Sequence, residues 1–187
     1  MRTIKLQMHL SIDNYVNMEQ GGTNFKWDHE VIKFCVNNLD SVDTILLGRK
    51  TAQELIPFWD KVATDSSHPD FALGQRISEL PKVVFSNTLT EHPWKNTTLL
   101  SGDMHTELSK LKKSAGNDIL VYGGASFAAT LIQNGLVDAF YFLLNPFRLG
   151  KGLTLFQPND DVQLFTLIKS MPFPCGTVLL HYNSNQS

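Results

Sequence analysis

The sequence predicts an α/β fold in which a mainly parallel sheet ends in an antiparallel hairpin. Apolar strand patterns alternate with helical patterns through most of the 187 residues, which is the order of parallel strands joined by helices. Two β-rich segments, Val162 to Met171 and Thr177 to Tyr182, close the chain and are joined by the turn sequence PFPCG. The length is typical of one domain, residues 1–187, and suffices for a core without disulfides.

Composition argues against several kinds of partner. The formal charge of −2 comes with scattered basic residues, so we expect no nucleic acid partner. The longest apolar run, Ala139 to Leu144, is far too short to cross a membrane. Cys35 and Cys175 have neither zinc-ligand spacing nor a disulfide pattern, so no metal is expected and a reducing cytoplasm is the simplest compartment.

In the first half of the chain, a strand over Thr3 to Leu10 precedes a polar segment, Ser11 to Phe25, without a regular period. A loop this long is typical of a functional lid or of disorder. Asp28 is positioned to cap a helix with the apolar face Val31, Ile32, Cys35, Val36 and Leu39. The next predicted elements are a strand over Val42 to Gly48 and a short helix from Arg49. After them we expect an irregular segment from Pro57 to Asp70 and a short helix over Phe71 to Leu80.

In the second half, four strands are expected, at Lys82 to Leu89, Thr97 to Gly102, Ile119 to Tyr122 and Val137 to Leu144. One helix, with Met104, Leu108 and Leu111 on one face, precedes the third of these strands. Another begins at a glycine pair and ends at Gly135, with Phe127, Ala128, Leu131 and Ile132 on one side.

The glycine pair, Gly123-Gly124, lies between a buried strand and a helix. It lets a ligand approach the backbone closely, and the first free N–H groups of the helix favour phosphate oxygens. The alternative is a tight turn that only packs two elements together.

A second strand ends in the same way. Gly48 closes it, and Arg49, Lys50 and Thr51 open the next helix with two cations and a hydroxyl. These groups suit an anion, although a solvated basic turn would have the same pattern.

Two more strands end in small polar residues, Ser86, Asn87 and Thr88 after one and Ser101 after the other. Ligands of parallel α/β sheets bind beyond the carboxyl ends of the strands, so we expect all four strand ends to face one crevice.

Six segments in order resemble the dihydrofolate reductase-like superfamily and, within it, proteins of the RibD C-terminal type, the reductase domain of riboflavin biosynthesis. They are SIDNYV, FKWDHE, TILLGRKTAQEL, VVFSNTL, ILVYGGASFAATLIQNGLVDAFYF and NPFRLGKGLTLF, so the resemblance covers nearly the whole chain. It implies a three-layer, NADPH-binding fold of about eight strands, often a homodimer, with a cis peptide bond between Gly123 and Gly124.

The resemblance also implies a place for each part of NADPH. Arg49 would hold the 2′-phosphate with help from Ser86 and Asn87, while His9 and Val16 would lie near the nicotinamide. The pyrophosphate would be reached from one helix start by Lys50 and Thr51, and from the other by Gly124, Ala125, Ser126 and Phe127. A guanidinium suits a phosphate, whereas an NAD site favours an acid on the ribose, so we expect NADPH over NADH.

Two acids are candidates for the catalytic carboxylate. The loop would close over the nicotinamide, with Asp13 and Trp27 beside the substrate, although Asp13-Asn14 also fits an ordinary turn. Dihydrofolate reductases carry a carboxylate inside the helix after the loop, whereas here Asp28 stands at the helix start, where it is either a cap or a catalyst. Arg148 and Lys151 could bind a substrate phosphate or be solvated loop cations.

These features predict an NADPH-dependent reductase of a small heterocycle of pyrimidine or pteridine type, as in riboflavin or folate pathways. The missing helix acid leaves a second hypothesis, a non-catalytic nucleotide-binding or interaction module with the reductase fold. No zinc-ligand spacing of an attached deaminase is present, so we expect a stand-alone protein. The C-terminal hairpin would form the dimer contact, because an edge hairpin is open to pairing.

Overall fold

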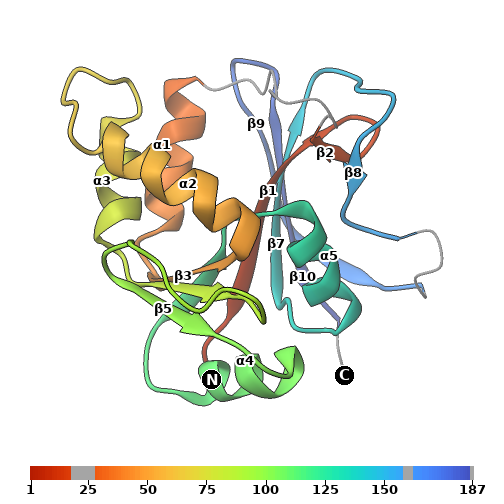
Figure 1. The fold of residues 1–187 in the computed structure, drawn as a ribbon. Coiled ribbons are helices and arrows are strands. Elements are labelled where there is room, and N and C mark those ends of the chain that lie inside the picture. Colours follow the sequence, from red (N-terminus) through yellow and green to blue (C-terminus); the bar gives the residue numbers. More distant parts are fainter. Residues whose placement is uncertain (18–27, 158–161, 186–187) are drawn as a thin grey trace.

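The computed structural model describes residues 1–17, 28–157 and 162–185. Eight strands form one sheet in the order β5-β4-β3-β6-β1-β7-β10-β9 (Figure 1). Neighbours from β5 to β7 are parallel, whereas β10 runs antiparallel to both β7 and β9. The predicted α/β class and the hairpin at the edge of the sheet are confirmed.

The strands of this sheet are β1 (Ile4–Ser11), β3 (Val42–Gly48), β4 (Lys82–Phe85), β5 (Thr97–Leu100), β6 (Asp118–Val121), β7 (Ala139–Asn145), β9 (Phe165–Pro172) and β10 (Val178–Ser184). The described helices are α1 (His29–Asn38), α2 (Arg49–Val62), α3 (Phe71–Glu79), α4 (Met104–Lys113) and α5 (Ala125–Gln133). None of these helices has the length and apolar character needed to span a bilayer.

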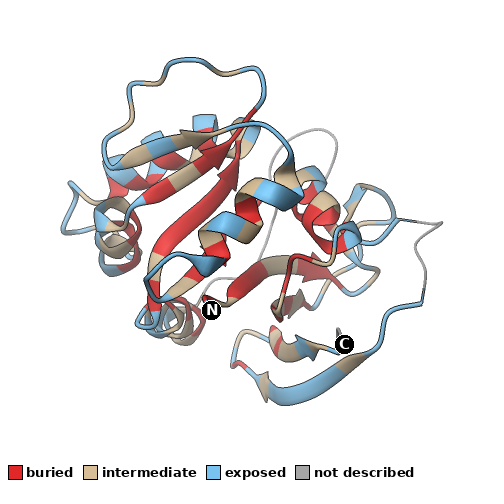
Figure 2. Cartoon of the chain, turned by 90° about the horizontal axis from the view of Figure 1, so that it is seen from below, coloured by how far each residue is buried: buried red, intermediate tan, exposed pale blue. Residues whose placement is uncertain are grey.

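Helices cover both faces of the sheet, which makes three layers. Helices α1, α2 and α3 pack on one face, and α4 and α5 pack on the other. Side chains alternate along β3, so that Ile45 and Leu47 belong to the first core and Leu46 to the second. The central strands are therefore buried on both faces (Figure 2).

Helix α2 is longer than predicted, because it continues from Pro57 to Val62. The prediction of an irregular segment starting at Pro57 was wrong for this part of the chain. Ile56, Trp59 and Val62 are buried against the sheet, and this burial outweighs the hydrogen bond that a proline cannot donate. Pro57 itself lies on the exposed side, where water can bond the freed carbonyl group.

A small second sheet was not predicted. It pairs β2 (Tyr15–Asn17) with β8 (Leu153–Thr154) in an antiparallel manner, so part of the Ser11 to Phe25 segment is a strand. Such short strands carry too few residues for a readable period. Residues 18–27, which include Trp27, lie outside the described residues.

Candidate functional site

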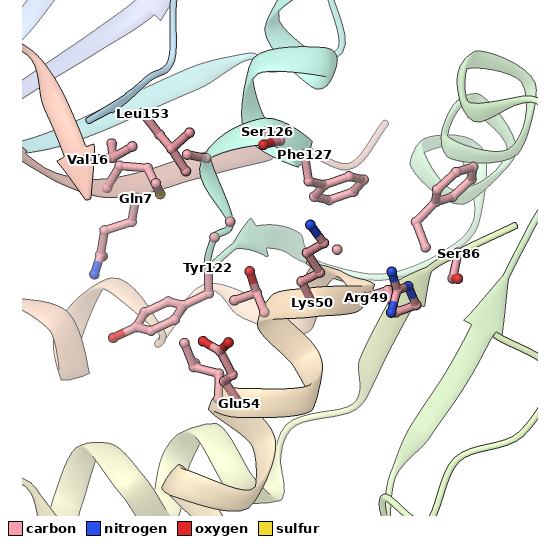
Figure 3. Close-up of a pocket in the computed structure, with 18 of the residues that line it drawn as sticks. Gln7, Val16, Arg49, Lys50, Glu54, Ser86, Tyr122, Ser126, Phe127 and Leu153 are labelled. Carbon is pink, nitrogen blue, oxygen red and sulfur yellow. The ribbon is translucent and has the colours of Figure 1, made fainter. Parts of the chain in front are cut away.

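A cavity of about 910 Å³ opens at the carboxyl ends of the central strands (Figure 3). Its walls come from β1, β2, the starts of α2 and α5, and the turn after β4. The described lining residues are Gln7, Met8, His9, Val16, Gly48, Arg49, Lys50, Thr51, Glu54, Leu55, Phe85, Ser86, Asn87, Thr88, Tyr122, Gly123, Gly124, Ala125, Ser126, Phe127 and Leu153. Three of the four predicted strand ends therefore face one crevice.

The starts of α2 and α5 are both suited to an anion. Their N-caps are Gly48 and Gly124, and neither helix has a side-chain cap or an acid in its first turn. By contrast, α1 and α4 are capped by Asp28 and Asp103, and each carries an acid in its first turn. The first N–H groups of α2 and α5 are therefore left without a side-chain acceptor at the cavity wall.

Two glycines allow these helix starts to come together. A Cβ atom on Gly48 would lie 2.8 Å from Phe127 Cβ, and one on Gly124 would collide with the Thr51 hydroxyl. The close approach of α2 and α5 thus requires glycine at both positions. The Gly123–Gly124 peptide bond is cis, as expected.

Arg49 and Ser86 lie at one end of the cavity (Figure 3). The Arg49 guanidinium is on the exposed first turn of α2, where Nη1 donates to Gln53 Oε1 at 3.3 Å. The Ser86 hydroxyl accepts hydrogen bonds from the N–H groups of Thr88 and Leu89 and so shapes the turn after β4. A cation and a turn with a hydroxyl thus border the same end of the cavity.

Asn87 lines the cavity, whereas Ser101 does not. The Asn87 side chain exchanges two hydrogen bonds with the backbone of Gly102, at 2.7 and 3.3 Å, and so joins the ends of β4 and β5. Ser101 is exposed and is not a lining residue. The prediction that its strand end faces the crevice was wrong, because β5 is the outermost parallel strand.

His9 and Val16 line the opposite side of the cavity, beside Leu153. Burial lowers the pKa of His9 to about 4, although a hydrogen bond with Asn145 partly opposes this effect. Asn145 Nδ2 lies 3.3 Å from His9 Nδ1, and the same amide group donates to the carbonyl oxygen of Leu143 at 2.8 Å. His9 is therefore a neutral imidazole at pH 7.

Asp13 belongs to the loop structure and is not a lining residue. Its carboxylate accepts hydrogen bonds from the N–H groups of Leu149 and Gly150, at 3.0 and 2.7 Å, and from the Ser11 hydroxyl at 2.6 Å. Partial desolvation favours protonation, but these hydrogen bonds outweigh it and lower the pKa of Asp13 to about 2. A carboxylate held in this way is a poor proton donor at neutral pH, so we place Asp13 outside the reaction centre.

Asp28 is the N-cap of α1 and also holds the hairpin turn. It accepts one hydrogen bond from the Val31 N–H at 2.8 Å and another from the Cys175 N–H at 3.0 Å. The bond from Val31 is the main reason why its pKa is lowered. Asp28 does not line the cavity. Its position is therefore explained by its role as a helix cap and not by a role as a catalytic carboxylate.

The two candidate phosphate ligands also lie outside the cavity lining. Arg148 is largely exposed, and its Nε is 3.7 Å from Asp13 Oδ2. Lys151 is exposed on the same loop. Within the described ranges, no group of three or more His, Cys, Asp or Glu side chains is arranged to hold a metal ion.

The family model of the RibD C-terminal domain matches residues 2–179. The chain belongs to this family. The uncharacterized protein YyaP of Bacillus subtilis (strain 168) is 30% identical over 186 residues, which cover 98% of this chain and 96% of YyaP.

Solved structures show the same fold as this RibD C-terminal domain protein. A protein from Shewanella sp. PV-4 matches with a TM-score of 0.78 and 21% identity, over 98% of this chain and 99% of that one. Dihydrofolate reductase from Enterococcus faecalis, complexed with NADP(H), matches with a TM-score of 0.65 and 12% identity, over 98% and 97% of the two chains.

Several lining residues of this family member were not predicted. Glu54 and Leu55 lie three and four positions after Thr51, so helical spacing could have placed them on the same face of α2. Tyr122 directly precedes the glycine pair, and its position beside Gly123 was a usable signal. Gln7 is a buried polar residue within a strand, and nothing in the sequence says which face of the sheet it joins.

Proposed function

We propose that this protein is an NADPH-dependent reductase of a small heterocyclic substrate of pyrimidine or pteridine type. The observation that carries the proposal is the pair of uncapped, acid-free starts of α2 and α5 at one cavity. Their N–H groups, with Lys50 and Thr51, would bind the pyrophosphate. Glycine at position 124 lets the start of α5 approach the Thr51 hydroxyl closely, which brings the two helix starts to the same cavity.

The remaining lining residues fit the other parts of the cofactor. Arg49 and Ser86 would hold the 2′-phosphate, and Asn87 would fix their turn through Gly102. His9 and Val16 would border the nicotinamide, which supplies a hydride when the cofactor is bound. A neutral His9 adds no positive charge beside the nicotinamide ring.

The test is a calorimetric titration of wild type and Arg49→Ala with NADPH and, separately, with NADH. Loss of a charged hydrogen bond to phosphate should weaken NADPH binding by about ten- to hundredfold. NADH lacks that phosphate, so its affinity should hardly change. Arg148→Ala is the matched control, because this exposed arginine is not a lining residue.

Equal loss of affinity for both cofactors would reject the role given to Arg49. If neither cofactor bound to wild type, the reductase proposal would fail. If NADPH bound but a panel of pyrimidines, pteridines and carbonyl compounds gave no turnover, the non-catalytic nucleotide-binding module would be the better hypothesis.

We also propose that two copies associate through β9. This strand is at the edge of the sheet, and Leu164, Leu167 and Ile168 on or beside it are 71%, 52% and 50% exposed. Light scattering should give the mass of a dimer for wild type and for Phe58→Glu, and that of a monomer for Leu167→Glu. A monomeric wild type at micromolar concentration would contradict this interface.

A cytoplasmic location is part of the same proposal. Cys35 and Cys175 are both free thiols, and burial raises the pKa of Cys35 to about 12. Free cysteines fit a reducing compartment. Fractionation of cells with an antibody against the protein would test the location.

A further inference from the structure

Three polar side chains from three different elements surround the end of the cavity opposite Arg49 (Figure 3). Gln7 comes from β1, Glu54 from α2 and Tyr122 from the turn after β6. We call this part of the cavity the inner chamber. Leu55 adds an apolar surface there. Polar groups that converge in a largely apolar pocket fix the orientation of a ligand.

Tyr122 presents a hydrogen-bond donor to the inner chamber. Its ring packs edge-on against Trp59, with 6.4 Å between the centroids. In the described part of the chain no hydrogen bond to its hydroxyl is found, and the residue is half-buried in the cavity wall. This burial raises the pKa of Tyr122 well above its usual range, so the hydroxyl keeps its proton at physiological pH.

Gln7 is held in one orientation by two neighbours. Its Oε1 accepts a hydrogen bond from Asn38 Nδ2 at 2.7 Å, and its Nε2 donates to Cys35 Sγ at 3.3 Å. An amide nitrogen carries two hydrogens, so a second N–H remains beside the cavity. Gln7 thereby offers a second donor at the same cavity.

Glu54 offers the complementary group, an acceptor. It lies three residues after Thr51 on α2, which turns it toward the cavity, and it is the one carboxylate among the described lining residues. Arg49 and Lys50, the cations of the cavity, belong to the first turn of the same helix, at the proposed cofactor end. A carboxylate favours a ligand with N–H donors over an anion.

We propose that the inner chamber binds a planar cyclic amide, with Glu54 accepting a hydrogen bond from the ring N–H and Tyr122 and Gln7 donating to the neighbouring carbonyl oxygen. This assignment rests on the proposed reductase function, because it places the substrate ring beside the backbone of Gly123 and Gly124. It makes Glu54 and Tyr122 the residues that determine substrate specificity.

The experiment compares two probes, uracil and 1,3-dimethyluracil, by ligand-observed NMR titration. Both have the ring and its carbonyl groups, but only uracil has N–H donors. Wild type, Glu54→Gln and Tyr122→Phe are titrated with and without NADPH. Asp60→Asn and Tyr182→Phe are the matched controls. Asp60 is, like Glu54, an exposed acid of α2, but it does not line the cavity, and Tyr182 packs in the core on the other face of the sheet.

Glu54→Gln should weaken uracil binding about tenfold or more and leave dimethyluracil binding unchanged. Tyr122→Phe should weaken both probes, because both keep the carbonyl oxygen. Equal effects of Glu54→Gln on the two probes, or no binding of uracil to wild type, would overturn the proposal. A failure of NADPH to bind would reject the proposed function instead, while the titrations without NADPH would still decide the assignment of the inner chamber.

Discussion

Replacement of His9 by glutamine should make the protein less sensitive to acid. Burial lowers the pKa of His9 from 6.5 to about 4 in the folded state. Between these values the unfolded chain binds a proton that the folded chain does not, so acid favours unfolding. The contribution of neutral His9 to the free energy of unfolding is complete above pH 6.5 and is lost as the pH falls toward 4.

The size of this effect follows from the two pKa values. The difference between 6.5 and about 4 corresponds to at most about 3 kcal/mol of stability, of which about 2 kcal/mol is lost by pH 5. Because His9 borders the cavity, water there reduces the effect, and the figure is an upper value. Glutamine has no titrating group, so this loss should be absent from His9→Gln.

Urea unfolding of wild type and His9→Gln at pH 7, 6 and 5, followed by tryptophan fluorescence, measures this difference. Between pH 7 and pH 5, the urea concentration at the unfolding midpoint should fall more for wild type than for His9→Gln. His29→Gln, which replaces a largely exposed histidine, should behave as wild type. If wild type and His9→Gln lost the same free energy of unfolding between pH 7 and 5, the reasoning would be refuted.

Two further changes test the packing around the site. Gly48→Ala puts a Cβ atom 2.8 Å from Phe127 Cβ, and this overpacking should lower the free energy of unfolding by about 1–3 kcal/mol. Thermal unfolding measures the loss, and a melting temperature equal to that of wild type would contradict this prediction. Asp28→Ala removes the cap of α1 and should cost about 1 kcal/mol or more, with Asp28→Asn less affected. Affinity for NADPH, measured by calorimetry, should not change in Asp28→Ala, since Asp28 lies outside the cavity lining.

Local patterns were enough to predict most of the fold. The strand at Val42–Gly48 and the cap at Asp28 could be read from a few neighbouring residues, because burial and capping depend on nearby chemistry. The same holds for the starts of α2 and α5, where glycine and small or cationic residues follow a strand. In a parallel sheet, such ends gather on one side whatever the order of the strands.

The sequence by itself therefore determined the α/β class and the cluster of strand ends around Arg49 and Gly124. Only the tertiary structure decided which other residues line the cavity at this cluster of strand ends. Strand order put Ser101 beyond the cavity, and the backbone groups that bind Asp13 lie more than 130 positions away along the chain. Contacts between distant segments depend on how whole elements pack, and no local sequence period encodes them. The inner chamber is an example, because Gln7, Glu54 and Tyr122 come from three different elements that only the tertiary structure brings together.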